Sequence, residues 1–137
     1  MAQRCAVLLF LVALFSCSGL TGPEAAAGTY VLETIDGTPL PFGVAIYQDT
    51  LGTFIAAEET AGWIRLDADG SYGVSSTFTD RTLEGDSLDT RVLEGSGSYA
   101  LSRDTVRFFE EGHPSRFGLL NGDVLTTSGQ YTRVYRR

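Results

Sequence analysis

The sequence predicts an all-β domain built as an antiparallel up-and-down meander. Short alternating runs rich in Tyr, Val, Ile, Phe and Thr begin at residue 29, glycine-containing turns separate them, and no segment has a sustained helical period. About eight to ten strands joined by short turns, with no long crossover, fit such a meander. Closure into a barrel would remove exposed strand edges, and a two-sheet β-sandwich is the alternative architecture.

Three hairpins are recognisable in the strand-forming region. Residues 115–127 hold Asn121-Gly122 between two apolar runs, and Asn-Gly supplies the positive φ angles of a tight turn. Residues 62–78 carry Ala-Asp-Gly between two alternating runs, and residues 97–109 carry Arg-Asp in the same way. Further strands are expected at 29–35, 42–48, 51–57 and 130–135.

The N-terminal residues 1–16 have the layout of a secretory signal peptide. A positive charge at Arg4 precedes an apolar run from Cys5 to Phe15, which is too short to span a bilayer as a helix. Removal of this segment leaves roughly 120 residues, enough for one domain with a single core.

The end of this segment resembles the lipobox of bacterial lipoproteins, with Leu14 three residues before Cys17 and the small Ser16 directly before it. Phe15 departs from the pattern, so ordinary signal cleavage stays open. The resemblance implies that Cys17 becomes the acylated first residue of the mature chain, and several acyl chains make a stable membrane anchor. Ser18 resembles the pattern that is sorted to the outer membrane of Gram-negative bacteria.

Cysteine content and charge agree with an exported, membrane-anchored envelope protein. The other cysteine, Cys5, lies in the segment that is removed, so the mature domain has no internal disulfide. Residues 17–28, rich in Gly, Ala and Pro, are expected to be the lipidated cysteine and a flexible tether, and residues 29–137 the barrel domain. Loss of Arg4 leaves nine basic residues against seventeen acidic ones, a net charge of −8, which makes nucleic acid a poor partner.

The first strand of the domain resembles the opening of lipocalin-like domains. In that family a Gly-x-Trp opens strand one, and an arginine near the end of the last strand packs across the aromatic ring to close the barrel. Here Gly28-Thr29-Tyr30, followed by LETIDG, places Tyr30 at the aromatic position, and Arg133 is the matching arginine. The resemblance implies a cup that binds or carries a small apolar or amphipathic molecule.

Sequence alone does not choose between a hollow barrel and a filled one, because eight-stranded barrels are just wide enough for either, and the inward-facing residues are favoured as core packing. A continuous cavity of about 300 Å³ or more would favour ligand binding. Its absence would favour an envelope interaction or structural module with a filled core, which presents its strands, Trp63 or residues 79–95 to another protein. That stretch, the longest without a clear pattern, is expected to form a lid or an extra strand. The candidate ligand contacts share the inward face of their strands: Leu32, Leu66, Tyr72, Val74, Phe78, Tyr99, Leu101, Phe108 and Phe117, with Ile64, Val106 and Leu119 on the same face.

The sequence offers little for catalysis or for a metal. The single histidine, His113, precedes a proline in a turn, and no nucleophile-elbow motif occurs. Asp67-x-Asp69-x-Ser71 resembles the start of a calcium loop, but Phe78 occupies the position of the bidentate glutamate, so a hairpin turn is favoured. We therefore expect no enzymatic activity, no metal and no cofactor.

Overall fold

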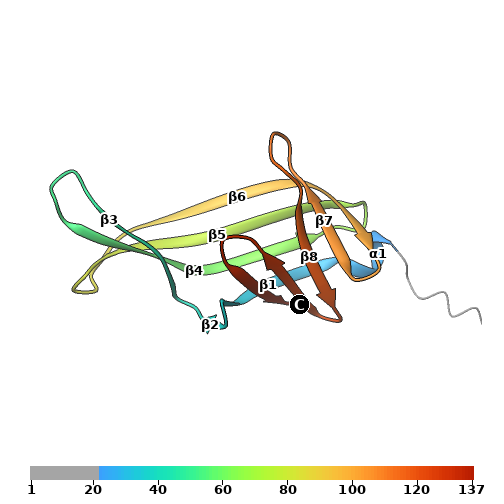
Figure 1. Ribbon diagram of the computed structural model, residues 1–137, viewed down its shortest axis with the longest axis horizontal. Helices are drawn as coiled ribbons and strands as arrows, with labels where there is room; N and C mark the ends of the chain where they lie inside the picture. The colour runs from blue at the N-terminus through green and yellow to red at the C-terminus, as the bar shows by residue number, and fades with distance from the viewer. Residues whose placement is uncertain (1–21) are drawn as a thin grey trace, which may run out of the picture.

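The computed structural model describes residues 22–137, which form a closed antiparallel β-barrel (Figure 1). Each strand from β3 to β9 pairs with the next in sequence, β10 pairs with β1, and β1 pairs with β4 to close the barrel. The predicted all-β meander is confirmed, and the closed sheet excludes the sandwich. The elements are α1 (Pro23–Ala26), β1 (Gly28–Ile35), β2 (Thr38–Pro39), β3 (Phe42–Gln48), β4 (Phe54–Leu66), β5 (Ser71–Thr82), β6 (Ser87–Ser102), β7 (Thr105–Phe109), β8 (Arg116–Asn121), β9 (Val124–Ser128) and β10 (Thr132–Arg136).

The three predicted hairpins are present, and one turn differs by a residue from the expectation. Asn121 pairs with Val124, so the turn between β8 and β9 consists of Gly122 and Asp123. Gly122 has a φ of +59° and occupies the first turn position, where a type II′ turn requires glycine. Asn121 therefore ends β8 instead of entering the turn.

Three strands are longer than the sequence predicts and extend beyond the barrel. The runs 51–57 and 62–66 belong mostly to one strand, β4, and residues 79–95 form the end of β5, a short turn and the start of β6, so the strand alternative is correct and the lid is not. Only residues Trp63–Leu66 of β4 pair with β1. The preceding part of β4 pairs instead with β3 on one side and β5 on the other.

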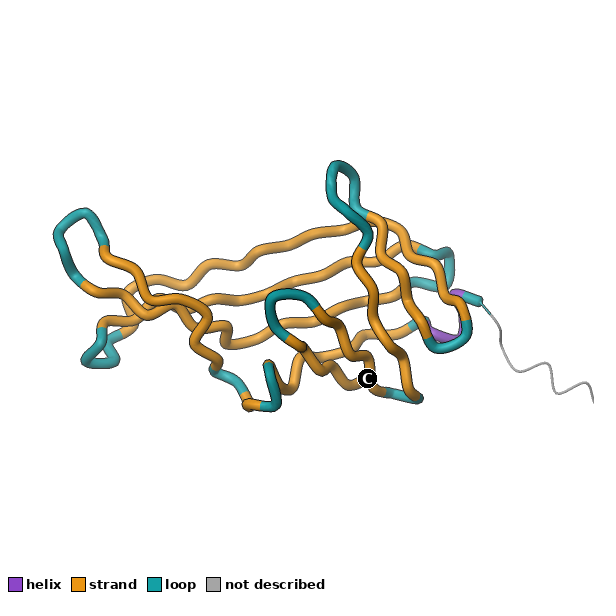
Figure 2. Tube along the Cα trace, viewed as in Figure 1, coloured by secondary structure: helices purple, strands orange, loops and turns teal. Residues whose placement is uncertain are grey.

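These extensions form a four-stranded sheet that we call the wing: residues 42–48, 54–61, 76–82 and 87–95, in the order β3-β4-β5-β6. The wing projects from one end of the barrel, and α1 lies at the other end (Figures 1 and 2). β4 and β5 stay paired from the barrel into the wing, with one register shift between Glu59 and Ala61. The side chains on one face of the wing therefore continue the inner face of the barrel.

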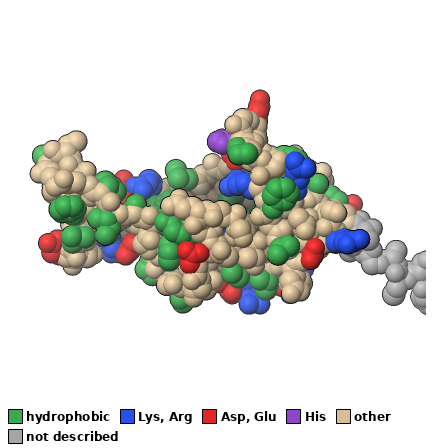
Figure 3. All heavy atoms as spheres, in the orientation of Figure 1, with side chains coloured by type: hydrophobic (Ala, Val, Ile, Leu, Met, Phe, Trp, Pro, Cys, Tyr) green, Lys and Arg blue, Asp and Glu red, His purple; other side chains and the backbone are tan. Residues whose placement is uncertain are grey.

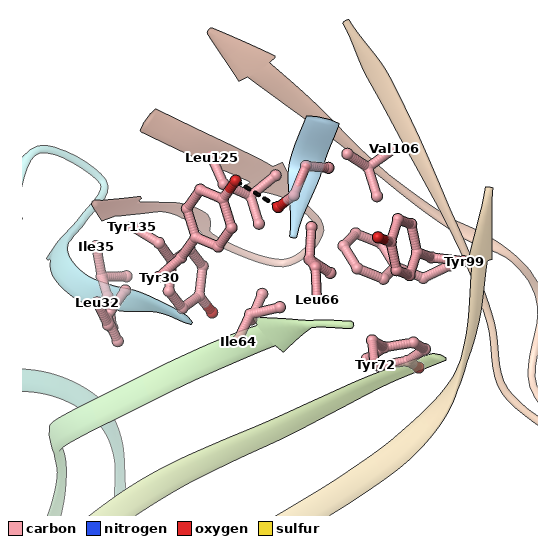
Figure 4. Packing of buried hydrophobic residues seen from close by; sticks show 12 residues of the cluster. Tyr30, Leu32, Ile35, Ile64, Leu66, Tyr72, Tyr99, Val106, Leu125 and Tyr135 are labelled. Atoms are coloured by element: carbon pink, nitrogen blue, oxygen red, sulfur yellow. Dashed lines mark hydrogen bonds between the residues drawn. The ribbon is translucent and has the colours of Figure 1, made fainter. Parts of the chain in front are cut away.

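The barrel is filled by its own side chains at the α1 end (Figure 4). Ala26 of α1 is fully buried, and its carbonyl oxygen accepts a hydrogen bond from the Tyr30 hydroxyl at 2.7 Å. The Tyr99 hydroxyl shares its proton between the carbonyl oxygens of Pro23 and Asp67, each 2.9 Å away. Residues 23–28, which composition placed in the tether, therefore belong to the folded domain. The buried cluster consists of Ala26, Tyr30, Leu32, Ile35, Ile64, Leu66, Tyr72, Tyr99, Val106, Phe108, Leu125 and Tyr135.

Two residues that were expected in the core of the barrel are exposed on β8, and one of them, Phe117, lies at the edge of a cavity. Phe117 and Leu119 are exposed, and Gly118 between them faces the interior. A Cβ atom at Gly118 would lie 3.1 Å from Leu125 Cδ1 and 3.4 Å from Phe108 Cε2. Because the core leaves no space for a side chain there, glycine takes the inward position and its apolar neighbours face out.

The predicted signal peptide and the lipidation site Cys17 lie outside the described residues. Within residues 22–137 no helix has the length and hydrophobicity needed to cross a membrane.

Candidate ligand site at the barrel mouth

The end of the barrel opposite α1 is open and holds a cavity of about 240 Å³. This mouth lies where β4 and β5 leave the barrel for the wing. It is smaller than the cavity of about 300 Å³ that would indicate a hollow cup. The mouth is lined by Ile64, Tyr72, Val74, Ser76, Phe108, Arg116, Phe117, Thr127, Ser128, Gly129, Tyr131, Arg133 and Tyr135.

Four of the nine candidate ligand contacts line this cavity: Tyr72, Val74, Phe108 and Phe117. The other five do not. Leu32, Leu66 and Tyr99 are buried in the filled core, and Leu101 packs against that core. Phe78 lies on the wing, where the Arg91 guanidinium is 5.6 Å from the centre of its ring.

The floor of the mouth is aromatic and apolar. The rings of Tyr72 and Phe108 meet edge to face, with centroids 5.0 Å apart. The Tyr72 hydroxyl is buried and has no hydrogen-bond partner within the described chain, and leaving such a group unpaired is unfavourable. Burial raises the pKa of Tyr135 to about 12, so this phenol is neutral at physiological pH.

The rim of the mouth carries two guanidinium groups, each with a carboxylate partner. Arg116 Nη2 lies 3.0 Å from Glu110 Oε2, and Arg133 Nη2 lies 2.8 Å from Glu59 Oε2. Glu59 is fully buried, and its other oxygen has no partner in residues 22–137. A guanidinium has five N–H donors, so each arginine keeps donors for a further acceptor.

Aromatic contacts join the mouth to the wing. The Arg133 guanidinium lies 5.7 Å from the centre of the Tyr131 ring, and that ring meets Phe42 of β3 edge to face at 5.3 Å. The Tyr131 hydroxyl donates to the Val44 carbonyl oxygen at 3.1 Å. The wing is thereby fixed to the barrel by both Tyr131 and the Glu59–Arg133 ion pair.

The arginine that packs across Tyr30 is Arg137, not Arg133. Its guanidinium lies 5.5 Å from the centre of the Tyr30 ring and donates to the Ala27 carbonyl oxygen at 2.9 Å and to Asp123 at 2.8 Å. The reason is the antiparallel pairing of β1 with β10, which places the start of β1 beside the end of the chain. Arg133 lies nearer the start of β10 and therefore reaches the mouth.

The alternation of residues in the sequence was enough to place part of the mouth lining on the inner face of the barrel. Tyr131, Arg133 and Tyr135 alternate along the last strand and share its inward face, as the period of a β-strand requires. Arg116 shares the face of Gly118 in the same way. None of the ligand contacts expected from the sequence lies on the last strand, and Arg133 was expected to close the barrel, so the residues of this strand were not expected at a ligand site.

The remaining chemical candidates lie away from the mouth. His113 is exposed in the connection between β7 and β8. Asp69 accepts hydrogen bonds from the hydroxyl and the amide of Ser71, and these bonds lower its pKa, as expected for a hairpin turn. Trp63 is half-buried on the outside of the barrel, where it covers Gly73. In residues 22–137 no three His, Cys, Asp or Glu side chains are grouped as a metal site would need.

No protein-family model matches the chain, and no curated protein or solved structure is detectably similar to it. The closed barrel is compatible with the lipocalin-like pattern at the start of the first strand.

Proposed function

We propose that this protein is an exported, lipid-anchored envelope protein that binds a small amphipathic molecule at the barrel mouth without converting it chemically. The observation that carries the binding proposal is the cavity of about 240 Å³, which combines an aromatic floor with two guanidinium groups at its rim. The anchor rests on the lipobox resemblance at Cys17. The proposed location, the outer membrane of the cell envelope, rests on the same lipobox and on Ser18 after it.

The size and lining of the mouth define the class of ligand. Typical small-molecule pockets occupy roughly 300–1,000 Å³, so this cavity takes a small molecule or one end of a longer one. An apolar end fits against Ile64, Val74 and Phe108, and an acceptor group fits beside Arg116 and Arg133. A short-chain carboxylate meets both requirements, since hydrogen bonds to charged groups are the stronger ones.

Native mass spectrometry of residues 18–137, exported to the periplasm and purified without added ligand, tests for a bound molecule. A discrete extra mass that organic solvent removes is the expected result. An NMR titration then compares octanoate with octan-1-ol, and octanoate should bind at least about tenfold more tightly because only its carboxylate pairs with the arginines.

Two matched variants locate the binding. Ser76→Phe places a ring in the cavity and should abolish the octanoate shifts, whereas Ser98→Phe places the same ring on the exposed outer face of β6 and should leave them unchanged. Loss of binding in both variants, or in neither, would show that the mouth is not the site.

The anchor has a separate test. Cys17→Ser should abolish fatty-acid labelling and membrane retention of the protein, because the thiol that accepts the lipid is removed. A variant that is still labelled and membrane-bound would refute the assignment.

A second candidate, an interaction module, is favoured by the wing. Hydrophobic side chains gather on the wing end of the molecule (Figure 3), and a soluble monomer rarely keeps so many exposed together. The exposed residues there are Ile46, Tyr47, Leu51, Phe54, Leu83, Leu88, Val92 and Leu93.

A further inference from the structure

The first half of β6 forms a free sheet edge. β6 pairs with β5 from Ser87 to Ser98 but pairs with β7 only from Ser98 to Ser102. Residues 87–94 are all exposed, and no strand of residues 22–137 pairs with their second side. A free edge of this length is a template for another strand.

The backbone groups available at this edge belong to the even-numbered residues. The Tyr99 amide donates to the Gly70 carbonyl oxygen, on the β5 side, at 2.7 Å. The amide and carbonyl groups of successive residues in a strand point to opposite sides, and the register with β5 is regular from Asp89 to Ser98. The odd-numbered residues of β6 therefore direct their backbone amide and carbonyl groups towards β5. Thr90 and Val92 therefore direct their amide and carbonyl groups away from the wing.

The other edge of the wing, β3, is less suited to pairing. Its register with β4 shifts between Gly43 and Ala45, so only residues 45–48 form a regular edge, and the Tyr131 hydroxyl donates to the carbonyl oxygen of Val44. Irregular edges of this kind resist the addition of a strand. In β6 the corresponding shift lies at the start of the strand, beside Leu88, so the edge beyond it is regular.

The sequence of the β6 edge is complementary to itself. If a second copy pairs antiparallel with the two-fold axis at Thr90, Asp89 of each copy lies directly opposite Arg91 of the other. Beyond these pairs, Val92 comes beside Leu88 of the second copy, at the register shift, and these side chains are 55% and 53% exposed in the single chain. Axes at Asp89 or Arg91 place like charges opposite each other, and an axis at Val92 places Arg91 opposite Leu93.

A charge imbalance within one chain favours the same pairing. Asp89 is directly opposite Asp80 on β5, and Asp80 is buried. The Arg91 guanidinium pairs with Asp80, whose second carboxylate oxygen has no partner in the described residues. Directly opposed like charges destabilise a sheet, and a second guanidinium beside Asp89 would relieve this.

We propose that a second copy of this chain docks antiparallel along the free edge of β6, with the two-fold axis at Thr90, so that two wings form one continuous sheet. This symmetric contact is isologous, as in most homodimers. It goes beyond ligand binding at the mouth, since residues 87–94 do not line the cavity.

Cysteine cross-linking of the full chain in cells tests the contact. Thr90→Cys should give a disulfide-linked homodimer on a non-reducing gel, because the two central residues of such a pair are about 5.5 Å apart, within disulfide range. Thr53→Cys, which is also exposed and lies in the loop between β3 and β4 at the opposite edge of the wing, should not. Adding Asp89→Arg to Thr90→Cys should reduce the cross-link about tenfold, because arginine then faces arginine.

Sedimentation of the purified protein in detergent provides a second measurement. Thr90→Pro removes an amide that points to the free edge and leaves the β5 ladder intact, so the monomer should keep its circular dichroism spectrum while the dimer is lost. A monomeric wild type, a dimer that survives Thr90→Pro, or a Thr90→Cys cross-link to a different protein would each overturn the proposal. Ser76→Phe should still dimerise, which separates this test from that of ligand binding.

Discussion

Removal of Arg133 should destabilise the fold more than removal of its partner Glu59, because the two ends of this ion pair are unequally buried. The Glu59 side chain is fully buried, whereas the Arg133 side chain is 25% exposed. In Arg133→Met the Glu59 carboxylate stays buried without a cation, and one of its oxygens already has no partner within the described residues. In Glu59→Gln the guanidinium still reaches water.

The magnitudes follow from this difference in burial. Breaking a buried ion pair by removing one partner costs about 3–5 kcal/mol, and the partial exposure of Arg133 places Arg133→Met at the low end, about 3 kcal/mol. Glu59→Gln keeps an acceptor for the guanidinium and should cost about 1 kcal/mol. The double variant should cost about 2 kcal/mol, less than the sum of the two single changes, because neither charge is left without its partner.

Urea unfolding, followed by Trp63 fluorescence and circular dichroism, measures these free energies of unfolding. Arg136→Met is the matched control, since Arg136 lies in the same strand and pairs with Glu33 in an exposed ion pair, and it should cost less than about 1 kcal/mol. Equal losses for Arg133→Met and Arg136→Met would refute the reasoning, as would equal losses for Arg133→Met and Glu59→Gln.

Three further changes test the barrel core. Gly97→Ala should cost about 2–3 kcal/mol in thermal unfolding, because its Cβ atom would clash with the Phe109 carbonyl oxygen and only backbone movement relieves this; a loss under about 0.5 kcal/mol would contradict it. Tyr99→Phe should cost about 1–2 kcal/mol and speed hydrogen exchange in α1, which loses the bond to Pro23; unchanged exchange would contradict it. Burial raises the pKa of Tyr99 and Tyr135 to about 12, above the value of about 10 in the unfolded chain, so their contribution to stability should be fully present below about pH 10 and should be lost towards pH 12. Tyr135→Phe should reduce that fall by about 3 kcal/mol, and an unchanged slope of stability against pH would contradict the assignment.

The meander was predictable because strand alternation and turn residues are local properties. The hairpin of β4 and β5 shows this, since Ile64 and Leu66 share a face with Tyr72 and Val74 in the sequence pattern and in the structure. The inward position of Gly118 was not predictable, because it depends on the volume of Leu125 on the neighbouring strand. Local alternation assigns apolar side chains to the interior and gives no reason to place a glycine there.

The wing was beyond prediction for a different reason. Glu58, Glu59 and Thr60 interrupt the apolar pattern of β4, so the sequence divides this strand into two runs and does not show that one strand continues from the barrel into the wing. The point where the strand leaves the barrel is set by β1, which pairs with β4 only through residues 28–31. The mouth and the Glu59–Arg133 ion pair depend on this limit, and the free edge of β6 depends on β7, which pairs with β6 only through residues 98–102. The candidate sites therefore depended on how far neighbouring strands pair, which the local pattern does not contain.

Ligand binding at the mouth and self-association of the wing should be nearly independent. A ligand shifts an equilibrium only by its difference in affinity for the two states, and no residue of the β6 edge lines the cavity. Octanoate should therefore change the dimer dissociation constant by less than about twofold, and by reciprocity Thr90→Pro should bind octanoate as tightly as the wild type does. A change of about tenfold in either measurement would contradict this independence and would point to the Glu59–Arg133 pair, which joins the mouth to the wing, as the connection between the two sites.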